Sequence, residues 1–151
     1  MENDTKWMIL ALNEAKLAQN QSEIPVGAIL IKQNTIIAQA HNQSILNNDP
    51  TAHAEIQLLR KAGDQQKNYR LTGSTLYVTL EPCTMCFGAM IHARIERIVF
   101  GSFDAKTGVC GSCINLNEKN FFNHKISITG GILEKQSSEL LRLFFKSKRD
   151  K

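Results

Sequence analysis

The residues with the clearest chemical potential lie in two short motifs, a His-Ala-Glu triplet that begins at His53 and a Pro-Cys-Thr-Met-Cys run that ends at Cys86. A catalytic zinc keeps three protein ligands and an open position for water. His53, Cys83 and Cys86 would supply these three ligands, which leaves the Glu55 carboxylate free to transfer protons. Zinc lowers the pKa of bound water to about 7. The combination therefore indicates hydrolytic deamination.

Other sites fit parts of this pattern. A Cys-x-x-Cys pair between a strand and a helix is also typical of thioredoxin-like redox proteins. A second pair, Cys110 and Cys113, begins 24 residues after Cys86, so four cysteines could form a structural zinc site. Glu55 as a fourth ligand would close the metal site as well. The His-Ala-Glu triplet favours the catalytic zinc, because neither cysteine-only site has a use for it.

Two helix starts are expected to position the ligands. Proline suits a first helical turn, and Cys83 and Cys86, three residues apart, would share one face of a helix beginning near Pro82. The partial positive charge at a helix N-terminus favours thiolates. The Asp-Pro-Thr sequence at residues 49–51 predicts a second helix start just before His53. Both helix ends should therefore direct ligands toward one point.

The remaining chain reads as alternating strands and helices. Strands are expected at 26–31, 36–40, 75–80, 97–100 and 126–129, and helices at 5–19, from 51 to 63, from 82, and 137–148. A turn at Gln33-Asn34 would join the first two strands into a hairpin, and residues 101–113 would form a loop. In the last helix an apolar face is expected to pack on the core, formed by Leu140, Leu141, Phe144 and Phe145. This alternation predicts an α/β/α sandwich with helices on both faces of a mixed sheet.

Length and composition suit a single deaminase domain over residues 1–151, because a chain of 151 residues with 42% hydrophobic residues can bury a sizeable core. The N-terminus lacks the features of a signal peptide, and no apolar run is long enough to span a bilayer. Four cysteines, two of them metal ligands, fit a reducing compartment better than a disulfide framework. We therefore expect a soluble cytoplasmic protein with no membrane partner.

The net charge of +4 is concentrated at the C-terminus. Residues 140–151 hold five of the 18 basic residues and one of the 14 acidic ones, so this segment accounts for the whole excess. A basic end is often only a solvated surface. The alternative is an electrostatic contact with nucleic acid.

With these residues in view, nearly the whole chain resembles the bacterial tRNA adenosine deaminases of the cytidine deaminase-like superfamily. The resemblance rests on the segments 49–55, 68–71, 75–95 and 104–108. The zinc motif alone would also admit cytidine, cytosine, guanine and deoxycytidylate deaminases. The Asp-Ala-Lys-Thr-Gly segment from Asp104 and the Phe144-Phe145 pair, followed by basic residues, point to the tRNA branch.

The resemblance implies a three-layer α/β/α sandwich with a mixed five-stranded sheet, one zinc ion per subunit and a homodimer. It also implies conversion of adenosine to inosine at the wobble position of an arginine tRNA, with the base displaced from the anticodon loop into a pocket. Zinc-activated hydroxide would attack C6, with Glu55 as the proton shuttle and ammonia as the leaving group.

The resemblance further assigns Asn42 and Ala54 to the target base, and it assigns Asp104, Lys106, Phe145 and Arg149 to the neighbouring anticodon nucleotides. Structural readings stay open for several of these residues. Asn42 would equally suit a turn, Ala54 a helix interior, Phe145 the core, and Asp104 a turn or a cap.

Two other functions are compatible with the motifs. A free-base or nucleoside deaminase would close its pocket over a small ligand and would not need a basic rim. A non-catalytic zinc-stabilised RNA-binding module would complete its metal shell with Glu55 or with the second cysteine pair.

Overall fold

The computed structural model describes residues 2–119 and 122–150. Along the chain the elements are α1 (Glu2–Asn20), β1 (Gly27–Lys32), β2 (Thr35–His41), α2 (Ala54–Gln66), β3 (Thr75–Leu80), α3 (Thr84–His92), β4 (Arg97–Ser102), a 3-10 turn (Leu116–Glu118), β5 (Ser127–Thr129) and α4 (Glu134–Arg149). Among these residues, no helix combines the length and the hydropathy that crossing a membrane requires.

The five strands form one mixed sheet in the order β2-β1-β3-β4-β5. Strand β1 pairs antiparallel with β2 and with β3, while β3, β4 and β5 run parallel. The β1–β2 connection turns at Gln33 and Asn34, which both adopt left-handed backbone conformations with φ of 50° and 60°. This turn matches the type that suits two-residue hairpin loops, and it confirms the predicted hairpin.

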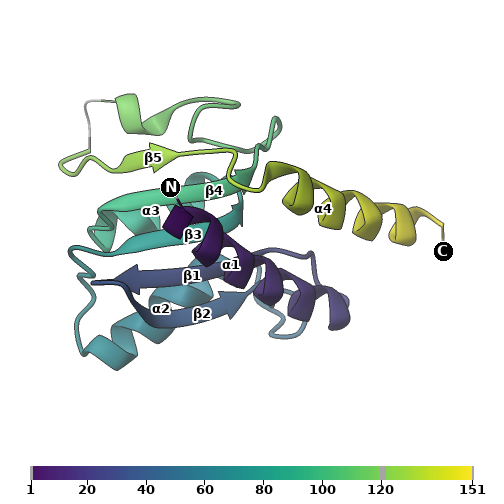
Figure 1. Cartoon of the computed structure of the whole chain (residues 1–151), viewed down its shortest axis with the longest axis horizontal. Coiled ribbons are helices and arrows are strands. Elements are labelled where there is room, and N and C mark those ends of the chain that lie inside the picture. Colours follow the sequence, from purple (N-terminus) through teal and green to yellow (C-terminus); the bar gives the residue numbers. More distant parts are fainter. Residues whose placement is uncertain (1, 120–121, 151) are drawn as a thin grey trace.

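Helices cover both faces of the sheet, with α1 and α4 on one side and α2 and α3 on the other (Figure 1). Side chains along a strand alternate between the two faces. In β1, Ala28 and Leu30 pack in the cluster that includes α2 and α3, whereas Ile29 and Ile31 pack in the cluster that includes α1. The predicted three-layer α/β/α sandwich is therefore confirmed.

Helix α1 lies unusually close to the start of β1. A Cβ atom added at Gly27 would sit 2.1 Å from the carbonyl oxygen of Ala11 and 2.4 Å from the amide nitrogen of Ala15. Both contacts are with backbone and cannot rotate away. Only glycine permits this approach, which brings the α1 backbone against the strand that precedes the site.

Two local predictions were wrong. The helix expected to start within residues 49–51 begins at Ala54, because the Asp49 carboxylate accepts hydrogen bonds from the amide and hydroxyl of Thr51 and so forms a turn. In α4, Phe144 is buried but Phe145 is 43% exposed. Adjacent helical residues point about 100° apart, and the C-terminal half of α4 projects beyond the sheet (Figure 1). Phe145 therefore has no core to enter.

Candidate active site and metal centre

The three predicted zinc ligands converge at the N-termini of α2 and α3. His53 is the N-cap of α2 and Cys83 is the N-cap of α3, while Cys86 lies in the first turn of α3 and is fully buried. The Nδ1 atom of His53 lies 3.7 Å from the Cys83 sulfur and 3.6 Å from the Cys86 sulfur. Both helix N-termini therefore present their ligands to one point, as the sequence predicts.

These distances fit a tetrahedral zinc ion. Zinc bonds of about 2.0–2.1 Å to nitrogen and about 2.3 Å to sulfur, at tetrahedral angles, place the two ligand atoms about 3.6 Å apart. Within the described parts of the chain, His53, Cys83 and Cys86 are the residues whose ligand atoms cluster closely enough to hold a metal ion. Glu55, Cys110 and Cys113 lie outside this cluster, which argues against a four-cysteine site and against Glu55 as a fourth ligand.

The electrostatics of the two thiols also suit a divalent cation. The hydrogen bond with Cys86, together with the nearby His53, lowers the pKa of the Cys83 thiol to about 4, although burial opposes this change. The pKa of the Cys86 thiol is raised, chiefly by its hydrogen bond with Cys83 and by burial. Two negative charges in this confined space repel each other, and a dication would stabilise both thiolates.

Glu55 lies in the first turn of α2, close to the ligands. Its side chain is buried, and this burial raises the pKa of Glu55 to about 7, with negative charge on Cys83 acting in the same direction. A carboxyl group with a pKa near neutrality can both accept and donate a proton at physiological pH. The burial and the raised pKa of Glu55 are compatible with proton transfer in this site.

A pocket of about 180 Å³ opens beside these groups, and its lining includes Asn42, His53, Ala54, Glu55, Cys83 and Asp104. Pockets for drug-sized ligands occupy roughly 300–1,000 Å³. This smaller cavity suits one flat group of the size of a nucleobase, with the rest of a larger substrate outside.

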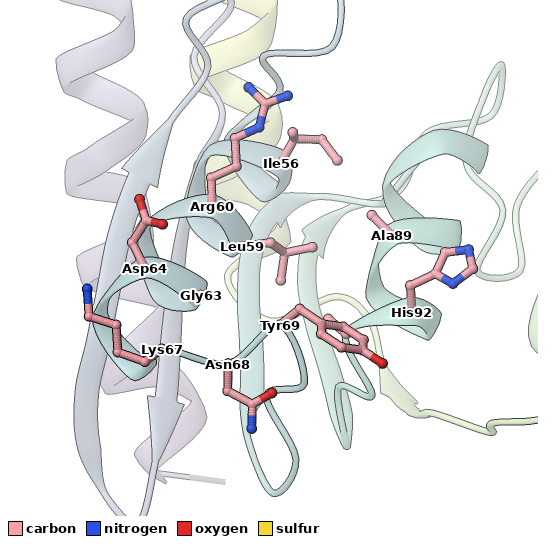
Figure 2. A pocket seen from close by; sticks show the side chains of 11 residues that line it. Ile56, Leu59, Arg60, Gly63, Asp64, Lys67, Asn68, Tyr69, Ala89 and His92 are labelled. Carbon is pink, nitrogen blue, oxygen red and sulfur yellow. The ribbon is translucent and has the colours of Figure 1, made fainter.

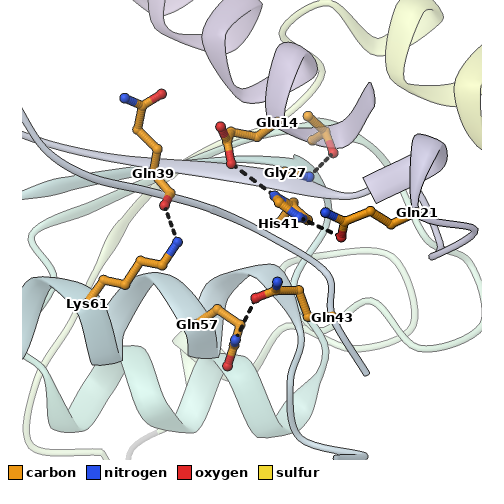
Figure 3. Close-up of polar contacts among 9 residues, drawn as sticks. Glu14, Gln21, Gly27, Gln39, His41, Gln43, Gln57 and Lys61 are labelled. Carbon is orange, nitrogen blue, oxygen red and sulfur yellow. Dashed lines mark hydrogen bonds and ion pairs between the residues drawn. The ribbon is translucent and has the colours of Figure 1, made fainter. Parts of the chain in front are cut away.

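Asn42 lines this pocket, and hydrogen bonds hold the residues on either side of it in the chain, His41 and Gln43 (Figure 3). The ring of His41 bonds Glu14 and Gln21 of the α1 region, each at 3.1 Å. The side chain of Gln43 accepts a hydrogen bond of 2.8 Å from Gln57 on α2. Among the residues that the structure describes, no side-chain hydrogen bond engages the carboxamide of Asn42, a residue that is buried as a whole and lines the pocket. That amide is thus placed to bind a ligand in the pocket.

Asp104 shapes the loop that follows β4. Its carboxylate accepts hydrogen bonds from the amides of Lys106 and Thr107 and from the Thr107 hydroxyl. Burial by itself would raise the pKa of Asp104, but these hydrogen bonds outweigh it and hold the pKa below its ordinary value. Asp104 therefore forms a turn, which is one of the roles that the sequence left open for it, and it also lines the pocket.

Three of the residues assigned to neighbouring nucleotides meet at a second hollow. Lys106 lies opposite Phe145 and Arg149 of α4, and together with Lys148 they line a shallow depression of about 480 Å³. The depression combines an exposed aromatic ring with three cationic side chains. These are the groups that bind bases by stacking and phosphates by charge.

Sequence reasoning missed three residues of this region, Glu23, Glu81 and Lys148. Glu23 and Glu81 are buried carboxylates in the wall of the first pocket, and Lys148 lines the second. The sequence did contain a sign of the role of Glu81. This glutamate lies between an apolar strand and the Pro-Cys motif, where a charged side chain is expected to be buried and to need hydrogen-bond partners. Lys148 was counted only as part of the basic C-terminus.

Comparison with known proteins defines the family. The cytidine and deoxycytidylate deaminase zinc-binding region matches residues 1–102. A tRNA-specific adenosine deaminase of Haemophilus influenzae is 48% identical over 150 residues, which are 99% of this chain and 87% of that protein. The tRNA-specific adenosine deaminase of Bacillus subtilis is 42% identical over 151 residues, which are 100% of this chain and 94% of that protein.

Solved structures agree with this assignment. A structure from work on A-to-I editing by tRNA:A34 deaminases at the wobble position matches with a TM-score of 0.88 and 41% identity, covering 91% of this chain and 99% of the other. A guanine deaminase from Nitrosomonas europaea matches with a TM-score of 0.78 at 21% identity, covering 93% and 83%, and so shares the fold. The chain therefore belongs to the zinc-binding cytidine and deoxycytidylate deaminase family and, within it, to the tRNA-specific adenosine deaminases.

Proposed function

We propose that this protein converts adenosine to inosine at the wobble position of an arginine tRNA anticodon, with residues 1–151 acting as one deaminase domain. The reaction adds water at C6 of the base and releases ammonia. One observation carries the proposal: a base-sized pocket, lined by Glu55 and by the ligands His53 and Cys83, opens near a basic, aromatic hollow. The names of the relatives support a tRNA substrate, and the resemblance of the sequence supports the arginine tRNA.

His53, Cys83 and Cys86 would hold the zinc ion. When bound there, zinc would lower the pKa of water to about 7 and so supply a nucleophile at neutral pH. Glu55 would take the proton from this water and deliver it to the departing amine. The burial of Glu55 supports this role, because it keeps the carboxyl group near the pKa at which it can perform both steps.

The target base would enter the pocket edge-on. The free amide of Asn42 would hydrogen-bond the base, and the backbone at Ala54, which is fully buried in the pocket wall, would contact it from the α2 side. Displacing a base from its stack costs a few kcal/mol, and less in an unpaired anticodon loop than in a duplex. The small volume of the pocket would restrict entry to this one base.

Neighbouring nucleotides of the anticodon loop would lie outside the pocket. Phe145, which is half exposed, would stack a base, an interaction worth about 1–3 kcal/mol. Lys106 and Arg149 would contact phosphates, and Asp104 would hold the Lys106 loop in place. A free-base deaminase would gain nothing from this hollow, which favours a polynucleotide substrate.

We also propose a homodimer formed through the outer surfaces of α2 and α3. An open groove of about 760 Å³ separates these helices, with Ile56, Leu59 and Ala89 along its apolar floor and Tyr69 at its edge (Figure 2). Both helices carry zinc ligands at their N-termini, so a second copy packed against them would help to fix the positions of these helices and of the ligands. Leu59→Glu should produce a monomer in sedimentation, whereas Ile9→Glu, at an exposed position on α1, should not.

The decisive experiment for the activity uses an arginine tRNA anticodon stem-loop. Purified protein with one zinc per chain is incubated with the stem-loop, and inosine at the wobble position is read by sequencing. Free adenosine, cytidine and guanine serve as parallel substrates, and the same stem-loop incubated without protein controls for background. Inosine in the stem-loop alone supports the proposal, and faster turnover of a free base or nucleoside would replace it with the small-molecule reaction.

A further inference from the structure

Glu81, directly after β3, holds the whole loop that follows β4. Its side chain is fully buried, and both carboxylate oxygens are used. Oε1 accepts a hydrogen bond of 3.0 Å from the Asp104 amide and another from the Ser112 hydroxyl. Oε2 accepts bonds from the amides of Cys110 and Ser112, at 2.9 and 3.1 Å. One side chain thus anchors the loop at both ends.

Gly108 gives independent support for this arrangement. A Cβ atom at Gly108 would lie 2.4 Å from Cδ of Glu81 and 2.5 Å from its Oε1. The loop backbone therefore passes so close to the carboxylate that no side chain fits between them. Position 108 is therefore restricted to glycine by the same close approach that lets Glu81 accept the loop hydrogen bonds.

The anchored loop connects the two hollows of the proposed site. Thr107 lines the base-sized pocket, while Lys106 lines the basic depression against α4. Cys83, the N-cap of α3, lies two residues after Glu81. Between them, the carbonyl of Pro82 accepts a hydrogen bond of 3.0 Å from the amide of Val109 in the loop. The same short segment therefore carries a metal ligand and fixes the loop that bears Lys106.

We infer that Glu81 is a positioning residue for tRNA deamination, which sets Lys106 at a fixed distance from the zinc ligands without contacting RNA itself. The inference rests on the proposed function. Binding gains when the contact residues are already ordered, because their conformational entropy is not lost in the complex. Glu81 would provide this order for the loop, so its loss should weaken RNA binding through Lys106.

The substitution Glu81→Gln tests the role with little change in shape. A carboxylate accepts hydrogen bonds at both oxygens, whereas an amide has one acceptor and two donor hydrogens. In either orientation the glutamine NH₂ group would face a backbone N–H, of Asp104 or of Cys110, and release that end of the loop. The chain offers a matched control in Glu23, which is also fully buried and accepts bonds from the amides of Ile45 and Leu46 at 3.1 and 2.7 Å.

The experiment is a double-mutant cycle on stem-loop binding, with Glu55→Ala in every protein so that substrate is not consumed. Lys106→Ala is expected to weaken binding about fivefold to tenfold with Glu81 present, and less than about twofold with Glu81→Gln, because contacting or coupled residues depart from additivity. Single-strand phosphate contacts contribute about 0.7 each to the salt slope, so Glu81→Gln alone should flatten that slope by about this amount. Lys106→Ala should keep its full effect in the Glu23→Gln background.

Zinc content and thermal midpoints separate positioning from general damage. One zinc per chain, a folded protein and loss of the Lys106 effect together support the inference. An unchanged Lys106 effect in folded Glu81→Gln overturns it, and so does equal coupling of Lys106 to Glu23. If Glu81→Gln does not fold, the cycle is run with Ser112→Ala, which removes the hydroxyl that donates to Oε1 of Glu81, and the same outcomes apply. Absence of inosine with the native protein would overturn the proposed function, whatever the cycle gives.

Discussion

The Nδ1 atom of His53 lies 3.6 Å from the sulfur of Cys86, although 33 positions separate the two residues in the chain. The contact arises because α2 and α3 pack against each other on one face of the sheet, with His53 and Cys83 as their N-caps. Their N-termini place partial positive charge around the sulfurs. The fold therefore places the three ligand side chains at the mutual distances that a zinc ion requires.

The first prediction concerns the ligand set. Cys86→Ser should lose zinc, because a hydroxyl is a poor zinc ligand compared with a thiolate. The double variant Cys110→Ser/Cys113→Ser should retain one zinc per chain, because neither thiol belongs to the cluster. Metal analysis of the purified proteins measures both. Zinc loss in the double variant would instead support the four-cysteine site.

The second prediction separates binding from chemistry. Glu55→Gln should keep zinc and stem-loop affinity but lower the rate of inosine formation by about 10²–10⁴-fold, which is typical of general acid–base catalysis. The amide keeps the shape of the side chain and removes its ability to carry a proton. Single-turnover assays give the rate, and a near-native rate would assign the proton to another group.

Short-range patterns made the metal site predictable. The ligands lie in two motifs of three and five residues, and the strands and helices follow clear changes of hydrophobic periodicity. The sequence also predicted a helix beginning near Pro82, because proline suits a first helical turn, and α3 begins two residues later at Thr84. These features depend on neighbours within about one turn of helix, which a single sequence displays directly.

Features that depend on distant partners were not predictable. The four donors of Glu81 come from residues 23 to 31 positions later, and no local pattern marks such a pairing. The exposure of Phe145 depends on where α4 passes the edge of the sheet, not on its own helical periodicity. The periodicity of α4 therefore predicted the burial of Phe144 but not the exposure of Phe145.

The third prediction tests the basic hollow one charge at a time. Arg149 lines the hollow, whereas Lys146, three positions earlier on the same helix, does not. Arg149→Ala should therefore reduce the slope of log affinity against log salt by about 0.7, the value for one phosphate contact on a single strand. Lys146→Ala should leave the slope unchanged. Equal slopes for all three proteins would remove Arg149 from the RNA contact.

Asp4 and Arg97 join the N-terminus of α1 to the start of β4. The Arg97 guanidinium donates to both carboxylate oxygens of Asp4, at 2.8 and 2.7 Å, and the hydroxyl of Tyr77 donates to Asp4 Oδ1 at 2.8 Å. Asp4 is buried, and Arg97 is about one third exposed. The hydrogen bonds from Arg97 hold the pKa of Asp4 below its ordinary value of 3.8, although burial opposes them.

The last prediction follows from that pKa and concerns stability against pH. A carboxyl group whose pKa is lower in the folded state stabilises the protein above its unfolded pKa, and the contribution disappears as the pH falls through the folded pKa. Asp4→Asn should therefore lower the free energy of unfolding at about pH 7 by about 1–3 kcal/mol, the range for hydrogen bonds to charged groups. Below the folded pKa the native protein is protonated at Asp4, so the difference between native and variant should vanish. Urea unfolding of both proteins at each pH measures this difference directly, and effects of acid on the zinc ligands cancel between them.

The control is Tyr77→Phe, which removes one hydrogen bond and keeps the ion pair. It should lower the free energy of unfolding by less at neutral pH and leave the acid-dependent loss of stability in place. A constant difference between native and Asp4→Asn at every pH would show that Asp4 contributes by packing and not by its charge.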